Sequence, residues 1–243
     1  MVKTVELFVT CLVDTFRPQV GEAVVNVLKR AGVTVHFSPE QTCCGQPAFN
    51  VGMRPEARAM AKQSIELLEK SPHPVVIPSG SCTNMVRHGF LELFREDPVW
   101  LKRAEALSTR TFEFSEFLVD VLDLNDIGAH FPEKIAYHPS CHLLRGVGVD
   151  HQPRLLLRSI EGVEIVDLPE EDVCCGFGGL FSIEHPELSG EMLANKIASI
   201  ESCGANTIVT CDTGCLMQIY GGLIKLGKTQ KVMHIAEVLD SNR

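Results

Sequence analysis

The segment that decides the fold reads Cys141, then Cys174-Cys175-Gly176-Phe177-Gly178-Gly179, then Cys211-Asp212-Thr213-Gly214-Cys215. Adjacent cysteines cannot easily both point into one apolar core from a strand, because successive side chains of a strand face opposite ways. At a turn, in contrast, two neighbouring thiolates can converge on one metal centre. The glycines that follow Cys174 and Cys175 favour such a turn.

The same arrangement occurs once earlier in the chain, which indicates an internal duplication. The separation between counterparts is nearly constant along the sequence. The matched pairs are Cys11 and Cys141, Cys43 and Cys174, Cys44 and Cys175, Pro55 and Pro186, and Cys82 and Cys215. Chance does not produce so regular a set of offsets, whereas a repeated structural unit does.

Short apolar runs alternate with segments whose apolar residues have helical spacing. The predicted strands are 5–10, 33–37 and 75–77 in the first repeat, and 135–138, 163–166 and 207–209 in the second. The predicted helices are 18–31, 55–70, 82–94, 98–108 and 114–122, then 153–159, 186–203 and one that begins at Cys215. Unbroken apolar strands between helices indicate parallel sheets covered on both faces.

The prediction is therefore an α/β protein of two duplicated lobes, each a small parallel sheet flanked by helices. We expect the first lobe at 1–122, a connection at 123–133 and the second lobe at 134–243. The cysteines follow strands, so they should gather at the carboxyl edge of each sheet, where ligands bind in such folds.

Composition narrows the class of protein. Hydrophobic residues make up 45% and charged residues 22%, which is typical of globular chains. The net charge of −9 and the lack of a basic run argue against a nucleic-acid partner. The first residues contain Glu6 within an apolar run, which is typical of a strand and not of a signal peptide. No run reaches the roughly 20 apolar residues of a membrane span, so we expect a soluble cytoplasmic protein.

Ten cysteines in a cytoplasmic chain call for a chemical explanation, because that compartment keeps thiols reduced. An isolated cysteine such as Cys203 is explained as a small buried hydrophobic residue. The clustered cysteines instead predict metal or redox chemistry. The four matched thiols are Cys11, Cys43, Cys44 and Cys82 in the first lobe, and Cys141, Cys174, Cys175 and Cys215 in the second.

Four thiolates can hold an iron-sulfur cluster or a structural zinc ion, and the number of ligands does not choose between them. Structural zinc sites usually take their ligands in tight Cys-x-x-Cys pairs. Here the ligands of each repeat are widely spread along the chain and include an adjacent pair. This spread favours a larger inorganic core, with zinc in one lobe as the alternative.

The pattern Cys-x31-Cys-Cys-Gly followed by a later cysteine-bearing turn, present twice, resembles the tandem cysteine-rich CCG domain family. The resemblance covers nearly the whole chain and extends to a component of heterodisulfide reductase and to the iron-sulfur component of glycolate oxidase. It is strongest to members that serve lactate utilization. The residues that carry it are Phe8-Val9-Thr10-Cys11-Leu12, Pro18-Gln19-Val20-Gly21, Gln41-Thr42-Cys43-Cys44-Gly45-Gln46-Pro47-Ala48, Pro78-Ser79-Gly80-Ser81-Cys82, Cys174-Cys175-Gly176-Phe177-Gly178-Gly179, Gly214-Cys215-Leu216-Met217 and His234-Ile235-Ala236-Glu237-Val238-Leu239.

What the resemblance implies is an iron-sulfur electron-transfer component of a three-protein complex that oxidises L-lactate to pyruvate. It implies at least one 4Fe-4S cluster on the matched cysteines. It also implies two other lactate-utilization proteins as partners, one of them an iron-sulfur protein, without which this oxidoreductase subunit is inactive. The alternatives are a thiol-disulfide reductase subunit of the heterodisulfide type and a non-enzymatic assembly module with structural zinc.

The sequence departs from the wider family at two positions. Family motifs end in Cys-x-x-Cys and so supply five thiols per repeat, whereas this chain has Ser79 and Asp212 in place of the first cysteine of that pair. The missing thiols favour a centre held by four thiolates and count against the heterodisulfide type. Asp212 or its neighbour Cys211 is a further candidate ligand, although the Cys211 side chain should point opposite to that of Asp212.

Two histidines, His138 and His142, flank Cys141. Each could donate a hydrogen bond to the centre or carry a proton near it. The alternative for each is an ordinary loop histidine that is hydrogen-bonded to the backbone. Two interpretations of Phe177-Gly178-Gly179 are open. The glycines let backbone N–H groups approach the thiols closely, or they only form a tight turn. No motif for a flavin or nicotinamide cofactor is evident, so lactate itself is expected to react elsewhere. These features favour the second lobe for the redox site.

Overall fold

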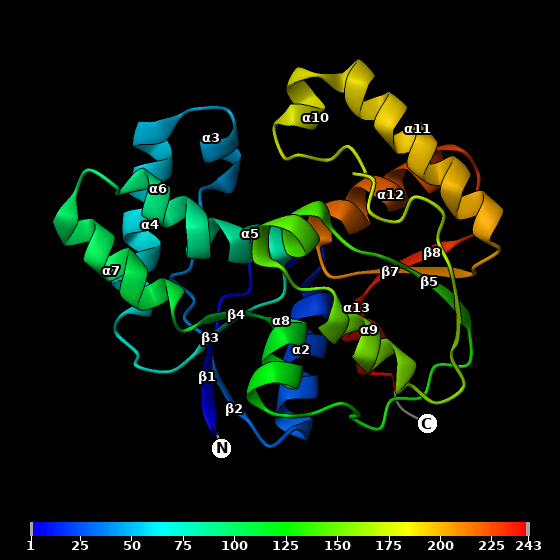
Figure 1. Ribbon diagram of the computed structural model, residues 1–243, viewed down its shortest axis with the longest axis horizontal. Helices are drawn as coiled ribbons and strands as arrows, with labels where there is room; N and C mark the ends of the chain where they lie inside the picture. Colours follow the sequence, from blue (N-terminus) through cyan, green and yellow to red (C-terminus); the bar gives the residue numbers. More distant parts are fainter. Residues whose placement is uncertain (1, 242–243) are drawn as a thin grey trace.

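The computed structural model describes residues 2–241, whose strands form two parallel sheets of four strands each (Figure 1). The first sheet has the order β2-β1-β3-β4 and consists of β1 (Thr4–Leu7), β2 (Thr34–His36), β3 (Val75–Ile77) and β4 (Thr111–Glu113). The second has the order β6-β5-β7-β8 and consists of β5 (Lys134–His138), β6 (Glu164–Val166), β7 (Thr207–Thr210) and β8 (Lys231–His234).

The register of the strands repeats as the sequence does. Thr4 on β1 pairs with Thr34 on β2, and Lys134 on β5 pairs with Glu164 on β6. The two residues of the second pair follow those of the first at the same offset, so the lobes pair their strands in the same register. The strand order is also the same in the two sheets. The predicted α/β fold of two duplicated lobes is confirmed.

Helices connect the strands and cover both sheets. Those of the first lobe are α1 (Cys11–Phe16), α2 (Pro18–Arg30), α3 (Gln46–Asn50), α4 (Arg54–Leu68), α5 (Gly80–Asn84), the π-helical turn η1 (Met85–Gly89), α6 (Phe90–Leu93), α7 (Pro98–Ser108), α8 (Phe114–Glu116) and the π-helical turn η2 (Phe117–Val121). Those of the second are the π-helical turn η3 (His142–Val147), α9 (His151–Arg158), α10 (Phe181–Glu184), α11 (Pro186–Cys203), α12 (Thr213–Lys225) and α13 (Ile235–Leu239).

The longer helices begin and end where the sequence signals predict. Pro18 stands at the start of α2 and Pro186 at the start of α11, where the missing N–H of proline costs no hydrogen bond. Gly204 ends α11 in the left-handed conformation, with φ of 69°. Valines of α2 at positions 20, 24 and 27 are fully buried, so its apolar face packs into the core.

Three hydrophobic clusters fill the molecule, and the central one belongs to both lobes. The first lobe alone builds one cluster, in which α4 and α7 cover the outer face of its sheet. The second lobe alone builds another, in which α11 and α12 cover its sheet. Between the sheets lies a common cluster to which α2, α8, α9 and α13 contribute, and α13 packs directly against α2. The lobes therefore share a core.

The sequence prediction missed one strand in each lobe and misjudged another. Both β4 and β8 lie at the edge of their sheets, and neither has the unbroken apolar run by which the other strands were predicted. The strand predicted at 5–10 ends at Leu7, because the chain turns sharply at Thr10, whose φ is 75°.

We propose 123–133 as the connection between the lobes. Within residues 2–241, no helix is both long and apolar enough to cross a membrane.

Candidate metal centre

The four cysteines of the first lobe come from three places along the chain. Cys11 begins α1, Cys43 and Cys44 lie in the loop before α3, and Cys82 lies in α5. The Sγ atoms of Cys44 and Cys82 are 3.4 Å apart. A hydrogen bond from Cys11 lowers the pKa of the Cys43 thiol to about 3, and the same contact raises the pKa of Cys11. Because the thiolate is the form that binds metals, Cys43 is prepared for that role.

The second lobe repeats this geometry. Cys141 precedes η3, Cys174 and Cys175 lie in the loop before α10, and Cys215 lies in the first turn of α12. The Sγ atoms of Cys141 and Cys174 are 4.0 Å apart. The pKa of Cys174 falls to about 2, chiefly because the Cys141 thiol donates a hydrogen bond to it. The first cysteine of each adjacent pair thus has a lowered pKa.

A glycine follows each pair because the turn requires one. Gly45 has φ of 84° and Gly176 has φ of 86°, a conformation that other residues rarely adopt. A Cβ atom at Gly176 would lie only 2.6 Å from the backbone oxygen of Ser189. The turn lets the Gly45 N–H donate to Cys43 Sγ at 3.5 Å and the Gly176 N–H donate to Cys174 Sγ at 3.4 Å. Hydrogen bonds of this kind stabilise thiolates and tune the potential of metal-sulfur centres.

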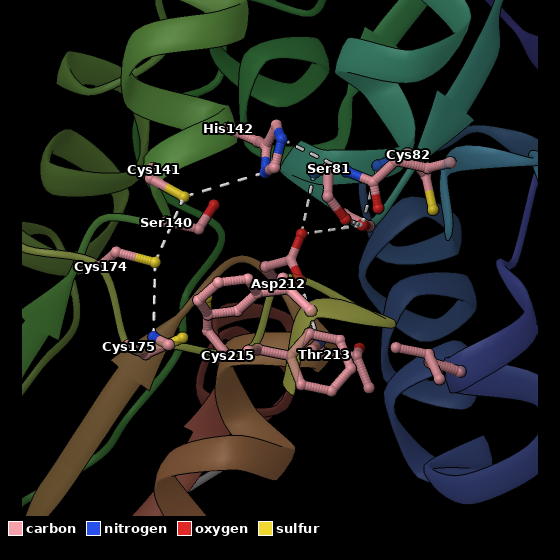
Figure 2. A pocket seen from close by; sticks show the side chains of 18 of the residues that line it. Ser81, Cys82, Ser140, Cys141, His142, Cys174, Cys175, Asp212, Thr213 and Cys215 are labelled. Carbon is pink, nitrogen blue, oxygen red and sulfur yellow. Dashed lines mark hydrogen bonds between the residues drawn. The ribbon is translucent and has the colours of Figure 1, made fainter. Parts of the chain in front are cut away.

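The two groups of cysteines meet at one cavity of about 290 Å³ between the lobes. Six of the eight matched cysteines line it, namely Cys11, Cys82, Cys141, Cys174, Cys175 and Cys215, whereas Cys43 and Cys44 do not. Leu12, Phe177 and Phe181 supply apolar walls. All ten cysteines of the chain are free thiols. Figure 2 shows the second lobe's cysteines on one side of Asp212 and Cys82 on the other.

The two positions that lack the family cysteine contact each other across the cavity. The Ser79 hydroxyl donates to Asp212 Oδ2 at 3.0 Å, and the Ser81 N–H donates to the same oxygen at 2.9 Å. The other oxygen of Asp212 accepts from the Gly214 N–H at 3.0 Å. The Asp212 carboxylate therefore caps α12 and also binds the first turn of α5 in the other lobe (Figure 2).

Cys211 points away from this cavity. It is fully buried in the core common to both lobes, and its Sγ atom lies 3.6 Å from the hydroxyl oxygen of Tyr137. Burial raises the pKa of the Cys211 thiol well above its ordinary value, which keeps it protonated. Its side chain does lie opposite to that of Asp212, since Asp212 lines the cavity.

His138 and His142 occupy different environments. The Nδ1 atom of His142 is 3.8 Å from Cys141 Sγ, and its Nε2 atom is 3.4 Å from Nε2 of Gln46 in the first lobe. His138 is buried, and its Nδ1 atom lies 3.0 Å from the Glu171 backbone oxygen. Burial lowers the pKa of His138 to about 4, so its imidazole is neutral near pH 7.

The sequence prediction overlooked Lys196, which lies behind the second group of cysteines. Its side chain is almost completely buried, and its ammonium group donates to the backbone oxygens of Glu170 at 2.6 Å and Glu171 at 3.3 Å. A sequence signal for it exists. Lys196 follows Ile65 at the same offset that relates Pro186 to Pro55, and a lysine in place of a core isoleucine marks an unusual position.

A comparison with protein families finds the same domain in both repeats. The family model described as a cysteine-rich domain, CCG, matches residues 5–87 and 135–220. The lactate utilization protein A of an Exiguobacterium species is 48% identical over 237 residues, which cover 97% of this chain and 96% of that protein. The protein of the same name from Bacillus pumilus is 46% identical and covers 98% of this chain and 99% of its own length. Among solved structures, a glutamate racemase of Bacillus anthracis is 12% identical, with a TM-score of 0.37 over 98% of this chain and 79% of its own.

Proposed function

The chain belongs to the CCG cysteine-rich domain family, and from this premise we propose that it is an iron-sulfur electron-transfer component of a three-protein complex oxidising L-lactate to pyruvate. The observation that supports the proposal is the meeting of two matched groups of thiols at one cavity between the lobes. The relatives named for lactate utilization support the substrate class, and we assign to this chain two partner proteins of the same system. Free thiols in this number favour a cytoplasmic location.

The donor atoms beside the cavity fit an iron-sulfur centre. Thiolates are the usual ligands of such clusters, and each lobe offers four from three separate segments. The N–H groups of Gly45 and Gly176 stabilise the charge that thiolates bring to the site. The matched cysteines would hold the cluster, and a bound cluster supplies one-electron transfer.

Lactate itself is assigned to another protein. Leu12, Phe177 and Phe181 make the wall beside the thiols apolar, and no motif for an organic redox cofactor is evident in the sequence. Hydride removal from a hydroxy acid needs an organic cofactor or a metal that carries the difficult chemistry. We assign that step to a partner protein, and we assign to this chain the transfer of electrons away from it.

Metal and sulfide analysis of anaerobically purified protein tests the proposal. We expect brown protein that contains iron and acid-labile sulfide and becomes paramagnetic on reduction. Cys82→Ser and Cys215→Ser each remove a ligand from one lobe, so each should lower the iron content markedly. Cys203→Ser is the matched control, because the Cys203 thiol donates to the Ile200 backbone oxygen outside both groups, and its iron content should not change. Colourless protein that contains zinc and cannot be reconstituted with iron contradicts the proposal.

The spacing of the thiols favours a second candidate, a structural zinc in one lobe. Two thiolates on a tetrahedral zinc ion lie about 3.8 Å apart, close to the 3.4 Å between Cys44 and Cys82. In that case one lobe contains zinc and the other iron, and the same metal analysis of Cys82→Ser and Cys215→Ser identifies which lobe holds which. A thiol-disulfide reductase of the heterodisulfide type is less well supported. The positions that would supply its extra thiols are Ser79 and Asp212, whose side chains are hydrogen-bonded to each other.

A further inference from the structure

The two lobes differ at two buried positions beside their cysteines. Strand register makes Lys134 the counterpart of Thr4, so His138 is the counterpart of Phe8. Phe8 belongs to the hydrophobic cluster of the first lobe and is 1% exposed. At the second position Lys196 replaces Ile65, which is completely buried in the same cluster. The second lobe thus places an imidazole and an ammonium group where the first places core side chains.

His138 has one ring nitrogen without a hydrogen-bond partner in the part of the chain that the structure describes. The side chain is 1% exposed, and its Nδ1 atom is 3.0 Å from the backbone oxygen of Glu171. A carbonyl oxygen only accepts hydrogen bonds, so Nδ1 carries the hydrogen of the neutral ring and Nε2 presents its lone pair. The Nε2 atom is buried and has no hydrogen-bond partner among the described residues. A buried polar atom without a partner is costly unless a ligand satisfies it.

Two thiols lie close to the His138 ring. A ring nitrogen of His138 and the Sγ atoms of Cys175 and Cys215 all lie within 4.8 Å of one another, and all three residues are buried. On one tetrahedral metal ion, an imidazole nitrogen and a thiolate sulfur are about 3.6 Å apart. A small inward movement of the side chains would therefore place all three atoms on a common metal.

Lys196 fixes the orientation of the imidazole. Its ammonium group donates to the same Glu171 oxygen that faces His138, at 3.3 Å, and to the Glu170 oxygen at 2.6 Å. The carbonyl that orients His138 is therefore itself held in place. Metal-binding histidines commonly donate their other N–H to a backbone carbonyl, which fixes the tautomer and the direction of the ring.

We propose that His138 is a ligand, through Nε2, of a metal centre in the second lobe that Cys175 and Cys215 also bind. The inference rests on the proposed function, which supplies the metal centre. It makes the second centre a mixed site of thiolates and imidazole, whereas the first, with Phe8 in the equivalent position, is bound by thiolates alone. A neutral imidazole brings no negative charge, whereas a thiolate does, so an iron centre with this mixed ligand set has a higher reduction potential than one bound by the same number of thiolates.

Pulsed electron paramagnetic resonance on reduced protein tests the assignment directly. Protein is produced with ¹⁵N-labelled histidine, so that a nitrogen coupled to the metal is recognised as histidine and not as backbone. We expect a strong histidine coupling in the wild type that disappears in His138→Phe, which copies the first lobe. The matched control is His142→Asn, which removes the other histidine near the thiols and should keep the coupling. If zinc occupies the lobe, the same measurement is made after substitution with cobalt(II).

A second variant separates a ligand from a residue that only supports the fold. His138→Cys offers a thiolate in place of the imidazole and should shift the midpoint potential of the centre to a more negative value. Circular dichroism and thermal unfolding of each variant without metal show whether it folds. A metal centre without histidine coupling, or a coupling that survives His138→Phe, overturns the inference alone. Protein that binds neither iron nor zinc overturns the proposed function and the inference with it.

Discussion

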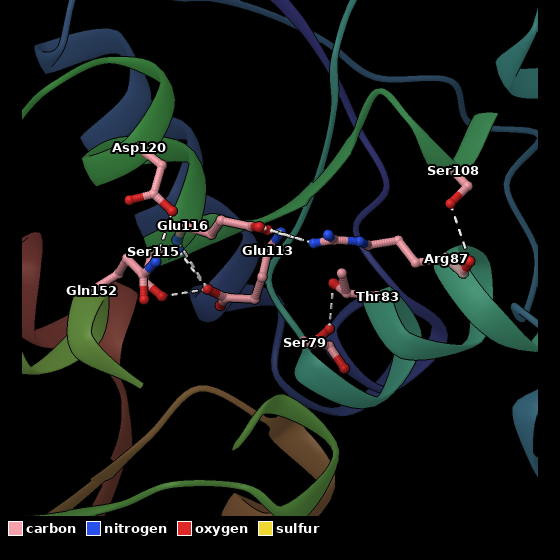
Figure 3. A network of polar contacts seen from close by, with 9 residues as sticks. All are labelled: Ser79, Thr83, Arg87, Ser108, Glu113, Ser115, Glu116, Asp120 and Gln152. Atoms are coloured by element: carbon pink, nitrogen blue, oxygen red, sulfur yellow. Dashed lines mark hydrogen bonds and ion pairs between the residues drawn. The ribbon is translucent and has the colours of Figure 1, made fainter. Parts of the chain in front are cut away.

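Glu113 is a carboxyl group enclosed between the lobes at the end of β4. It is completely buried, and one of its oxygens accepts hydrogen bonds from the backbone N–H groups of Ser115 and Glu116, at 2.7 Å and 3.3 Å. The other oxygen has no hydrogen-bond partner within residues 2–241. Figure 3 shows Glu113 beside Glu116, whose carboxylate pairs with Arg87. Burial raises the pKa of Glu113 from its ordinary value of 4.5 to about 7.

Because of Glu113, we expect the free energy of unfolding to fall as the pH rises. The folded protein holds the Glu113 proton up to a pH of about 7, whereas the unfolded chain releases it near 4.5. The stabilisation is therefore complete below pH 4.5 and is lost as the pH rises through 7, in total about 3 kcal/mol. Glu113→Gln is always neutral and should lack this component. Thermal unfolding of both proteins from acidic to mildly alkaline pH measures the difference, and parallel pH profiles contradict the prediction.

At the scale of the element, the contact between α5 and η3 joins the lobes most closely. Gly80 is the first residue of α5, and a Cβ atom there would lie 2.5 Å from Cβ and 2.9 Å from Cα of Leu143 in η3. Backbone atoms cannot move aside cheaply, so these two elements pack together only if position 80 is glycine. The sequence Pro78-Ser79-Gly80-Ser81-Cys82 therefore has a packing role besides carrying a thiol.

Gly80→Ala is expected to lower the free energy of unfolding by about 1 to 3 kcal/mol, as overpacking does in tightly packed interiors. Gly190→Ala is the matched control, since a Cβ atom at this position of α11 meets nothing within 4 Å. That variant should gain about 0.5 to 1 kcal/mol, because alanine is favoured over glycine in a helix interior. Urea unfolding measures both, and equal stability of the two variants counts against the role of Gly80.

The elements that the sequence predicted well are those with several turns of periodic pattern. Helices α2, α4 and α11 were predicted within two residues of their observed ends, because proline marks their starts and apolar spacing continues over several turns. Strands β4 and β8 were missed because neither contains an unbroken apolar run: β4 has only Phe112, and β8 has only Val232 and Met233 between Lys231 and His234. Tertiary contacts, and not local pattern, make these segments strands.

At the scale of the molecule, the hydrogen bond between Ser79 and Asp212 joins the two lobes at the cavity. Both residues are buried, with 3% and 4% of their surface exposed. The duplication identified both positions as departures from the family pattern. It could not reveal their contact, because a repeat in sequence determines how each lobe folds but not how the lobes pack. The common cavity needed the structure for the same reason, whereas the cysteines that line it were predicted from the duplication.

A double-mutant cycle measures what this contact contributes. Ser79→Ala is expected to lower the unfolding free energy of metal-free protein by about 1 to 2 kcal/mol, and Asp212→Ala by more, because hydrogen bonds to a buried carboxylate are strong. The effects of the two changes should not add, since they remove the same bond. Ser159→Ala is the control, because the Ser159 hydroxyl donates to the Leu156 backbone oxygen, and its effect should add to that of Asp212→Ala. Additive effects of Ser79→Ala and Asp212→Ala would contradict the coupling.

The core that lies between the two sheets has a consequence for the origin of the chain. Residues of α2 and α8 from one lobe and of α9 and α13 from the other are buried there against each other. A one-lobe ancestor would have exposed that apolar face to water, and association of two identical copies is the simplest way to cover it. A symmetric homodimer is therefore the simplest ancestor of the duplicated chain. Fusion freed the two copies to diverge, so that a histidine could arise in one half without its counterpart in the other.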